Sequence, residues 1–371
     1  MFHGKRILFM KKRFARWGNN LLLLGCAAVC LWCVGTKFQA WAQEQGGDAL
    51  LFAAGMQAQP ASSPSGASPS PSPSPGGEAP LEEAYPLPDD GVVSLGGGQE
   101  AAPAVTPDPS RSSAPVEEIQ LEGGAQVADF FVKDSTGSGT DLLAALEEEP
   151  SVHLKRDGSA EILIYHTHTS EAYSQSYTGF YYTDMATRTE DPDQSVVAAG
   201  EALKQALEAQ GFGVVHDTTV NDTLYNGSYD RSWEVLQKNL AEYPTLQVTI
   251  DVHRDSMTTD SGVKYKPTVT VNGRKAAQVM LIAGCDANGG WGDFPRWEEN
   301  LRLALRVQQK LQQLYPGLAR PLNFSNSKYN MNATPGSMLV EVGTEVNTVS
   351  EARYAGQLAG DAIGQALKAC P

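Results

Sequence analysis

Apolar residues in the second half of the chain are spaced alternately as in strands and as in helices. Short apolar runs predict buried strands at residues 161–165, 213–217, 246–252, 268–271, 277–283 and 337–342. Amphipathic spacing predicts helices at residues 195–210, 229–243, 297–315 and 349–367. Asn272 and Gly273 predict a hairpin between the fourth and fifth of these strands. The alternation predicts an α/β domain in which a mostly parallel sheet is flanked by helices.

The N-terminal end of the chain has the pattern of a membrane anchor. The 20 residues 17–36 carry no charge, and as a helix they would span about 30 Å, the thickness of the hydrocarbon core of a bilayer. Lys and Arg residues before this stretch predict that residues 1–16 stay in the cytoplasm and that the rest of the chain is exported. A cleaved signal peptide is one alternative, because Ala40 and Ala42 resemble a cleavage site, and a lipobox that ends at Cys26 is another. All three interpretations export the same domain.

Residues 37–125 are predicted to form a disordered linker. Residues 60–88 contain nine of the 22 prolines of the chain, interleaved with Ser, Gly and Ala, and such a composition cannot build a core. The folded domain is therefore assigned to residues 126–371. There, 20 Lys and Arg stand against 31 Asp and Glu, a net charge of −11. This acidic balance argues against nucleic acid as a partner.

Three predicted strands end at side chains that can bind a metal ion or accept a proton. His168 follows the first strand, His253 follows the third, and Glu341 ends the last. Because the carboxyl ends of parallel strands meet at one edge of a sheet, we expect these side chains to converge. Catalytic zinc commonly takes two histidines and a carboxylate, and a further carboxylate acts as general base. The sequence therefore predicts a Zn²⁺ site held by His168 and His253, with Glu341 as the catalytic base.

The same segments resemble zinc N-acetylmuramoyl-L-alanine amidases. The strand and turn at residues 162–168 are similar to the first metal-binding segment of these enzymes, with His168 rather than His166 at the ligand position. Residues 251–255 are similar to their second histidine segment, and residues 339–343 to the segment that carries their catalytic glutamate. The resemblance implies the phosphorylase/hydrolase-like α/β fold of these amidases and the same zinc chemistry.

A closer resemblance, over about residues 125–370, is to the stage II sporulation protein P family. It rests on several motifs that follow one another in order, at residues 166–173, 216–219, 225–228, 251–255, 315–320 and 335–347. The resemblance implies a peptidoglycan amidase that also cleaves stem-peptide cross-links and acts in engulfment of the forespore. It implies a single-pass protein of the mother-cell membrane whose catalytic domain lies in the intermembrane space. A membrane-bound lytic transglycosylase (SpoIID) and a polytopic membrane protein (SpoIIM) are its implied partners.

Two glutamates compete for the third zinc position. The general amidase pattern places a glutamate just before the first long helix, which points to Glu190. Glu171 follows His168 by three residues, lies within the sporulation-family motif and can face the same ion if the turn is tight. The sequence leaves both glutamates open, with one as the ligand and the other nearby.

Arg254 and Asp255 flank His253 on its C-terminal side. They are predicted to bind carboxylates of the substrate or to orient the histidine. The alternative for both residues is an ordinary ion pair, which would make them structural.

Other functions remain open from the sequence. One is a zinc hydrolase that cleaves a different amide polymer, such as a poly-glutamyl chain, and another is a catalytically inactive cell-wall-binding module. The presence of His168, His253 and Glu341 together favours an enzyme. A serine hydrolase is disfavoured, because the chain contains no Gly-x-Ser-x-Gly motif.

Overall fold

The computed structural model describes residues 92–93 and 105–370. The predicted anchor at 17–36, the basic residues before it and most of the predicted linker lie outside the described residues. No helix within the described ranges is both long enough and apolar enough to cross a membrane.

The main sheet contains eight strands. In their order across the sheet they are β3 (Ala125–Val127), β4 (Phe130–Asp134), β12 (Leu322–Ser325), β11 (Val279–Gly284), β13 (Gly336–Thr344), β8 (Val248–Asp255), β5 (Ala160–Tyr165) and β7 (Gly213–His216). The apolar runs predicted from the sequence became β5, β8 and β13, which are buried along almost their whole length. Strands of this kind lie in a sheet that is covered on both faces.

The α/β prediction is confirmed, but the prediction of a mostly parallel sheet is wrong, because the sheets are mixed. In the main sheet, β13, β8, β5 and β7 run parallel, whereas β11 runs antiparallel to β13 and β3 runs antiparallel to β4. The turn at Asn272 and Gly273 accounts for the direction of β11. It reverses the chain as the sequence predicts. After Gln278 the returning chain continues into the main sheet as β11, which pairs antiparallel with β13.

A second sheet has five strands. They are β1 (Val92–Val93), β2 (Ser113–Leu121), β6 (Phe180–Tyr182), β9 (Lys264–Val271) and β10 (Arg274–Ala277). Because β2 falls inside the stretch predicted as linker, ordered structure begins before residue 126. Val116, Ile119 and Leu121 of β2 are buried although Glu117 and Glu118 lie between them. These acidic residues hide the strand pattern in the sequence.

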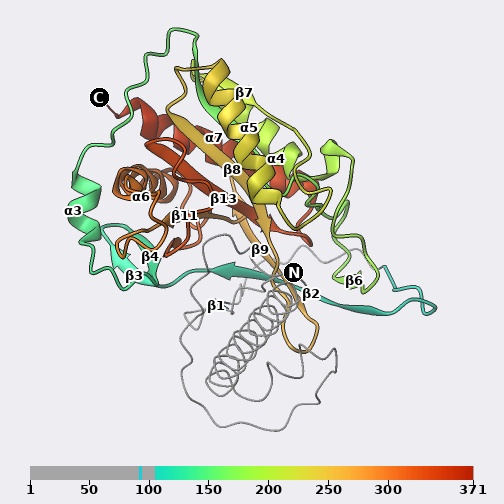
Figure 1. Cartoon of the computed structure of the whole chain (residues 1–371). Helices are drawn as coiled ribbons and strands as arrows, with labels where there is room; N and C mark the ends of the chain where they lie inside the picture. The colour runs from blue at the N-terminus through green and yellow to red at the C-terminus, as the bar shows by residue number, and fades with distance from the viewer. Residues whose placement is uncertain (1–91, 94–104, 371) are drawn as a thin grey trace, which may run out of the picture. The chain divides into compact units, whose positions relative to one another are not determined.

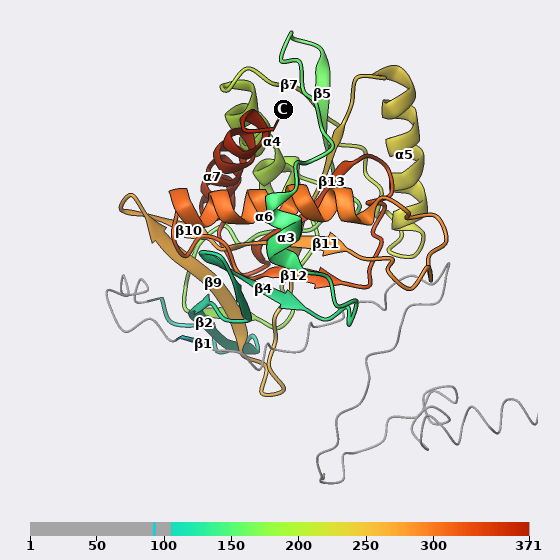
Figure 2. The same ribbon diagram turned by 90° about the vertical axis from the view of Figure 1, so that its left-hand side faces the viewer.

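Helices cover both faces of the main sheet (Figure 1). They are α3 (Leu142–Glu147), the short 3-10 helix η1 (Pro192–Gln194), α4 (Val196–Glu208), α5 (Ser228–Glu242), α6 (Trp297–Leu314) and α7 (Val349–Lys368). The four predicted helices are all found, with bounds that differ from prediction by at most two residues. Ile162 and Ile164 of β5 pack into the core of α4, α6 and α7, whereas Leu163 and Tyr165 pack with Leu236 of α5. Alternate strand residues point to opposite faces, so α5 covers one face and the other long helices cover the second (Figure 2).

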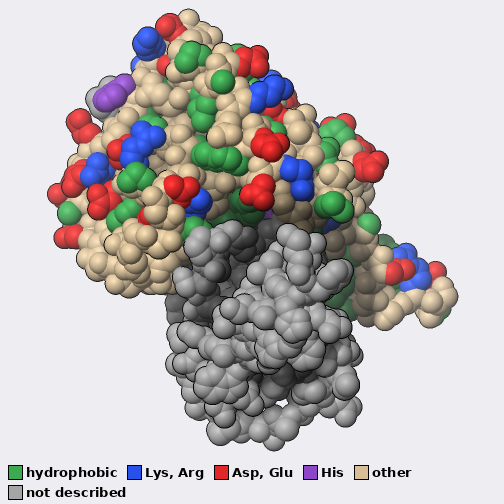
Figure 3. Space-filling model, in the orientation of Figure 1, with side chains coloured by type: hydrophobic (Ala, Val, Ile, Leu, Met, Phe, Trp, Pro, Cys, Tyr) green, Lys and Arg blue, Asp and Glu red, His purple; other side chains and the backbone are tan. Residues whose placement is uncertain are grey.

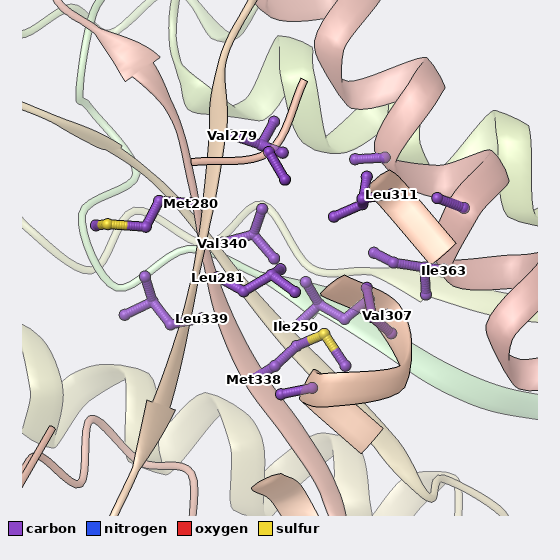
Figure 4. Packing of buried hydrophobic residues seen from close by; sticks show 14 of the residues in the cluster. Ile250, Val279, Met280, Leu281, Val307, Leu311, Met338, Leu339, Val340 and Ile363 are labelled. Carbon is purple, nitrogen blue, oxygen red and sulfur yellow. The ribbon is translucent and has the colours of Figure 1, made fainter. Parts of the chain in front are cut away.

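The larger core holds the central strands in place. Figure 4 shows Val307 and Leu311 of α6 and Ile363 of α7 on the side of the sheet to which Leu281 and Val340 point. All five side chains are fully buried, and burial of each contributes on the order of 1.5–3 kcal/mol. This packing fixes β8, β11 and β13 relative to one another, and it thereby fixes the residues at their ends.

Candidate active site

Neighbouring strands bring Glu341 and His253 side by side. The register of the parallel pair β13–β8 places Glu341 opposite His253, so both side chains leave the same face of the sheet. Both are buried. The strands continue further than predicted, through Asp255 and Thr344. His253 therefore lies within β8 and not beyond its end, and Glu341 lies within β13, as predicted.

An irregularity in β13 follows Glu341 directly. The register with β8 shifts between Glu341 and Thr344, and Gly343 in this interval has φ +62°, a left-handed conformation that favours glycine. A Cβ atom at Gly343 would lie 2.5 Å from Oδ1 of Asn347, and this oxygen accepts the backbone N–H of Thr344 at 2.9 Å. Gly343 and Asn347 therefore shape the strand next to Glu341.

His168 reaches the same place from the turn that follows β5. The centroid of its ring lies 5.3 Å from that of His253, and the two planes are 88° apart. Tyr225 stacks on His168 at 4.7 Å, and Tyr229 contacts it edge-on at 5.8 Å. The sequence prediction that His168 and His253 converge is consistent with this geometry, and the two tyrosines form an aromatic wall around the first ring.

His166, which is buried, forms a separate pair with the partly buried His216. Nε2 of His166 lies 2.9 Å from Nε2 of His216, and Nδ1 of His166 lies 2.8 Å from the carbonyl oxygen of Val252. Nδ1 of His216 contacts Glu201 at 3.0 Å. Both rings therefore have partners outside the candidate site, in keeping with the expectation that His168 rather than His166 is the ligand in this turn.

Asp251 is a residue of the site that the sequence predictions do not include. Its carboxylate accepts the backbone N–H of Thr167 at 2.9 Å and the hydroxyl of Thr167 at 2.6 Å. Its Oδ1 also lies 3.0 Å from Nε2 of His253. Asp251 thus holds the turn that carries His168 and lies against the ring of His253. The signal in the sequence is the spacing of two residues between Asp251 and His253, which puts both side chains on one face of a strand.

Glu171 is the glutamate that the fold brings to the histidines. Its Oε2 lies 3.8 Å from Nδ1 of His253 and accepts the backbone N–H of Arg254 at 3.1 Å. Glu171 is buried, whereas Glu190, the other candidate, is exposed. The geometry therefore favours Glu171 over Glu190 as the third ligand.

Burial and charge give the ionisable groups of the site different proton affinities. Burial, followed by the charge of His253, lowers the pKa of His168 to about 3, so this imidazole is neutral, as a metal ligand must be. Burial also disfavours a charge on His253, but the adjacent carboxylate of Asp251 outweighs it and raises the pKa of His253 to about 10. A metal ion bound to this ring would therefore displace a proton. Burial raises the pKa of Glu341 to about 8, although the charge of His253 acts in the opposite direction.

The side chains at this place carry atoms of the kinds that bind zinc, but these atoms are not arranged around a common centre. Within residues 92–93 and 105–370, no group of three or more His, Cys, Asp or Glu side chains is arranged to hold a metal ion. Nδ1 of His168 and Oε2 of Glu341 are nevertheless buried without a hydrogen-bond partner among the described residues. Two ligand atoms on a tetrahedral zinc ion lie about 3.3 Å apart, and Nδ1 of His253 and Oε2 of Glu171 are 3.8 Å apart. Imidazole nitrogens with a carboxylate oxygen are a set that fits this ion.

Arg254 and Asp255 face the protein interior. Nε and Nη2 of Arg254 donate to the backbone carbonyls of Ala172 at 3.1 Å and Thr187 at 2.8 Å. Oδ2 of Asp255 lies 2.7 Å from Nη1 of Arg320. These contacts tie β8 to the segments that follow β5 and precede β12. They favour the structural alternative for both residues over the predicted binding of substrate.

A comparison with known families decides where the chain belongs. The model of the stage II sporulation protein P (SpoIIP) family matches residues 108–364. The chain is a member of this family. The resemblance inferred from the motifs is therefore confirmed, and the matched range contains His168, His253 and Glu341.

Individual proteins that resemble this family member share less than a third of their aligned residues with it. Stage II sporulation protein P of Bacillus subtilis (strain 168) is 29% identical over 270 residues, which make up 69% of this chain and 62% of the relative. The matching region therefore spans less than two thirds of that relative. The CwlD amidase from Clostridioides difficile, solved in complex with the GerS lipoprotein, is 12% identical, with a TM-score of 0.35 over 56% of this chain and 98% of that chain. The N-acetylmuramoyl-L-alanine amidase AmiC2 of Nostoc punctiforme is 12% identical, with a TM-score of 0.33 over 58% and 97%. Likeness at these scores carries no argument for the site.

Proposed function

We propose that this member of the stage II sporulation protein P family is a zinc-dependent N-acetylmuramoyl-L-alanine amidase that hydrolyses peptidoglycan during sporulation. The observation that carries the proposal is that His168, His253 and Glu341, from three distant segments, lie together in a buried place. Nδ1 of His168 and Oε2 of Glu341 are buried there without a hydrogen-bond partner among the described residues, and a bound ion or substrate would satisfy them.

The proposed metal ligands are His168, His253 and Glu171. Zinc at these ligands supplies a Lewis acid that polarises the scissile carbonyl and acidifies water. Asp251 contacts Nε2 of His253 at 3.0 Å and so leaves Nδ1, the nitrogen nearer Glu171, to face the site. An outer carboxylate of this kind fixes the orientation of a ligand histidine.

Glu341 is the proposed general base and general acid. It takes a proton from the attacking water, whose oxygen bonds to the lactyl carbonyl carbon of N-acetylmuramic acid. When the bond from that carbon to nitrogen breaks, Glu341 passes the proton to the leaving amine of L-alanine. A carboxyl whose pKa is about 8 can hold or release a proton near neutral pH, which suits both steps.

Family membership extends the proposal to location and partners. The uncharged stretch at residues 17–36 would anchor the chain in the mother-cell membrane, with the domain in the intermembrane space. The proposed partners are SpoIID, a lytic transglycosylase, and SpoIIM, a polytopic membrane protein. Cleavage of stem-peptide cross-links is the proposed second activity of the same residues, since it breaks the same kind of bond.

The test is to incubate the purified full chain with peptidoglycan, with and without a chelator, and to identify the products by mass spectrometry. An amidase releases intact stem peptides that begin with L-alanine, and chelation abolishes the release. His168→Ala should behave like the chelated protein, whereas His153→Ala, at an exposed position, should behave like wild type.

Other products would point elsewhere. Shortened peptides indicate an endopeptidase, and activity on a poly-glutamyl chain alone indicates a hydrolase of another polymer. Binding to the wall without any product would indicate an inactive binding module. Release that chelation and zinc removal leave unchanged would contradict the metal assignment.

A further inference from the structure

Arg188 lies beside the candidate active site. An isolated antiparallel bridge joins its backbone to that of Glu171. Its guanidinium lies over the ring of Tyr225 at 5.3 Å, and that ring stacks on His168 at 4.7 Å. A single aromatic ring therefore separates Arg188 from a proposed metal ligand.

Buried partners hold one edge of this guanidinium. Nη1 of Arg188 donates to Oδ2 of Asp222 and, at 3.2 Å, to Oγ of Ser170. The side chain of Asp222 is fully buried, and its carboxylate also accepts the hydroxyl of Ser170 at 2.6 Å. The anchor orients the guanidinium but occupies only part of its donors.

The other edge of the guanidinium is available to a ligand. The side chain of Arg188 is 35% exposed, and its Nε and Nη2 donate to no residue that the structure describes. Arg231 and Arg254 differ, because Nε, Nη1 and Nη2 of each donate to backbone carbonyls. Arg188 thus presents a planar pair of donors, the arrangement that matches a carboxylate.

Three carboxylates lie close to Arg188. Glu171, Asp251 and Asp222 all lie in or next to the site, and on the face drawn in Figure 3 Lys and Arg side chains are interspersed with Asp and Glu. An approaching carboxylate would meet repulsion here unless a cation receives it. Stem peptides of peptidoglycan carry free carboxylates within a few bonds of the amide that an amidase cuts.

We propose that Arg188 determines specificity by binding a free carboxylate of the stem peptide through Nε and Nη2, and that Asp222 positions it. The inference rests on the proposed peptidoglycan amidase function. It assigns recognition of the substrate to Arg188 in place of the predicted Arg254 and Asp255, whose polar groups are bound within the protein.

The test compares three synthetic stem peptides: one with all its carboxylates free, and two in which a different single carboxylate is converted to an amide. Their affinities for the full chain are measured by calorimetry without added metal, so that zinc does not contribute. Wild type should bind one of the amidated peptides about 10- to 100-fold more weakly than the free peptide, the range expected for a hydrogen bond to a charged group. Arg188→Gln should abolish this preference, and Arg188→Lys should keep only part of it, because an ammonium cannot form the paired contact. Equal affinity of wild type for all three peptides would overturn the proposal.

Hydrolysis of muropeptides by the zinc-loaded chain gives a second readout. In Arg188→Gln, KM for the free-carboxylate substrate should rise while kcat stays close to wild type. Arg353→Gln is the matched control, since Arg353 forms an exposed ion pair with Asp193 at 2.7 Å, and it should leave preference and KM unchanged. A preference that survives in Arg188→Gln would overturn the assignment. If wild type cleaves no muropeptide, the proposed function fails, and the peptide affinities still test Arg188 separately.

Discussion

Two of the places where the described chain buries charged side chains, the cluster around Lys266 and the candidate active site, differ in how the charges are paired. Lys266 is fully buried, and its Nζ lies 2.7 Å from a carboxylate oxygen of Glu118 and 2.7 Å from one of Glu351. Lys275 adds a second positive charge 2.8 Å from Glu118, and Glu351 forms the capping box of α7 with Thr348. In this cluster each charge has an opposite partner, and the contacts join β2, β9 and α7.

At the candidate active site the compensation is incomplete. His253 has Asp251 and Glu171 near it, but buried atoms of His168 and Glu341 have no hydrogen-bond partner among the described residues. An unpaired buried polar atom costs stability and persists where function requires it. The comparison teaches that burial of charge alone does not identify a functional site, whereas unpaired atoms that lie together with metal-binding side chains point to one.

The largest effect is expected at the candidate active site, where a substitution should lower activity but not stability. Glu341→Gln should slow hydrolysis about 10²- to 10⁴-fold, the usual contribution of a general base, without lowering the free energy of unfolding. Product release followed by mass spectrometry and urea titration measure the two quantities. Glu234→Gln, at an exposed position of α5, is the control and should change neither. Retained activity in Glu341→Gln would remove this residue from the mechanism.

Lys266→Met should have the opposite profile, with a large loss of stability. Removal of one partner leaves Glu118 and Glu351 buried with less compensation, and such a loss lowers the free energy of unfolding by about 3–5 kcal/mol. Urea denaturation measures it, and the exposed control Lys238→Met should change it by less than about 0.5 kcal/mol. A change in Lys266→Met as small as in the control would show that the cluster does not stabilise the fold.

Asp251→Asn should weaken zinc binding, because it removes the charge that orients His253. Loss of an outer-shell carboxylate typically lowers metal affinity about 10- to 100-fold. Competition with a chromophoric chelator measures the affinity, with the exposed Asp260→Asn as control. Unchanged affinity would mean that Asp251 serves only to hold the turn at Thr167.

The smallest effect is a dependence of stability on pH at the Lys266 cluster. Burial alone would raise the pKa of Glu118, but hydrogen bonds from Lys266 and Lys275 outweigh it and place the pKa below its ordinary value of 4.5. A carboxyl with a lowered pKa in the folded state contributes stability at neutral pH, and this contribution is lost as the pH falls below the ordinary pKa and through the lowered one. Glu118→Gln should therefore be less stable than wild type at pH 7, with a difference that shrinks in acid. A constant difference across the urea titrations would contradict the linkage.

The sequence predicts the proposed catalytic centre better than its surroundings. His168, His253 and Glu341 are found by their places after or within apolar strands, because strand ends are visible in a hydrophobic pattern. The anchoring of Arg188 by Asp222 and Ser170 joins residues far apart in the chain, and no local pattern reports such contacts. The same limit applies to Arg254, since spacing gives the face of a strand on which a side chain lies but not what covers that face.

The strand pattern has a similar limit at the level of the fold. Periodicity reports that residues 277–283 are buried, but it does not report which neighbour the strand pairs with or in which direction. The chain leaves the hairpin at Gln278 and joins β12 and β13 as β11. The direction of pairing is a long-range property, and this is why a mixed sheet reads as a parallel one.

The glycine at position 343 has a consequence for anyone who surveys variants of this protein. Any side chain there would press on Asn347, whose amide also reaches the carbonyl of Pro267 in the second sheet. A substitution two residues from Glu341 would thus displace Asn347 and so disturb the start of α7 and its contact with β9. It would not act directly on the attacking water molecule. Screens for lost wall digestion would score such variants as inactive enzymes, although no reacting group had been touched.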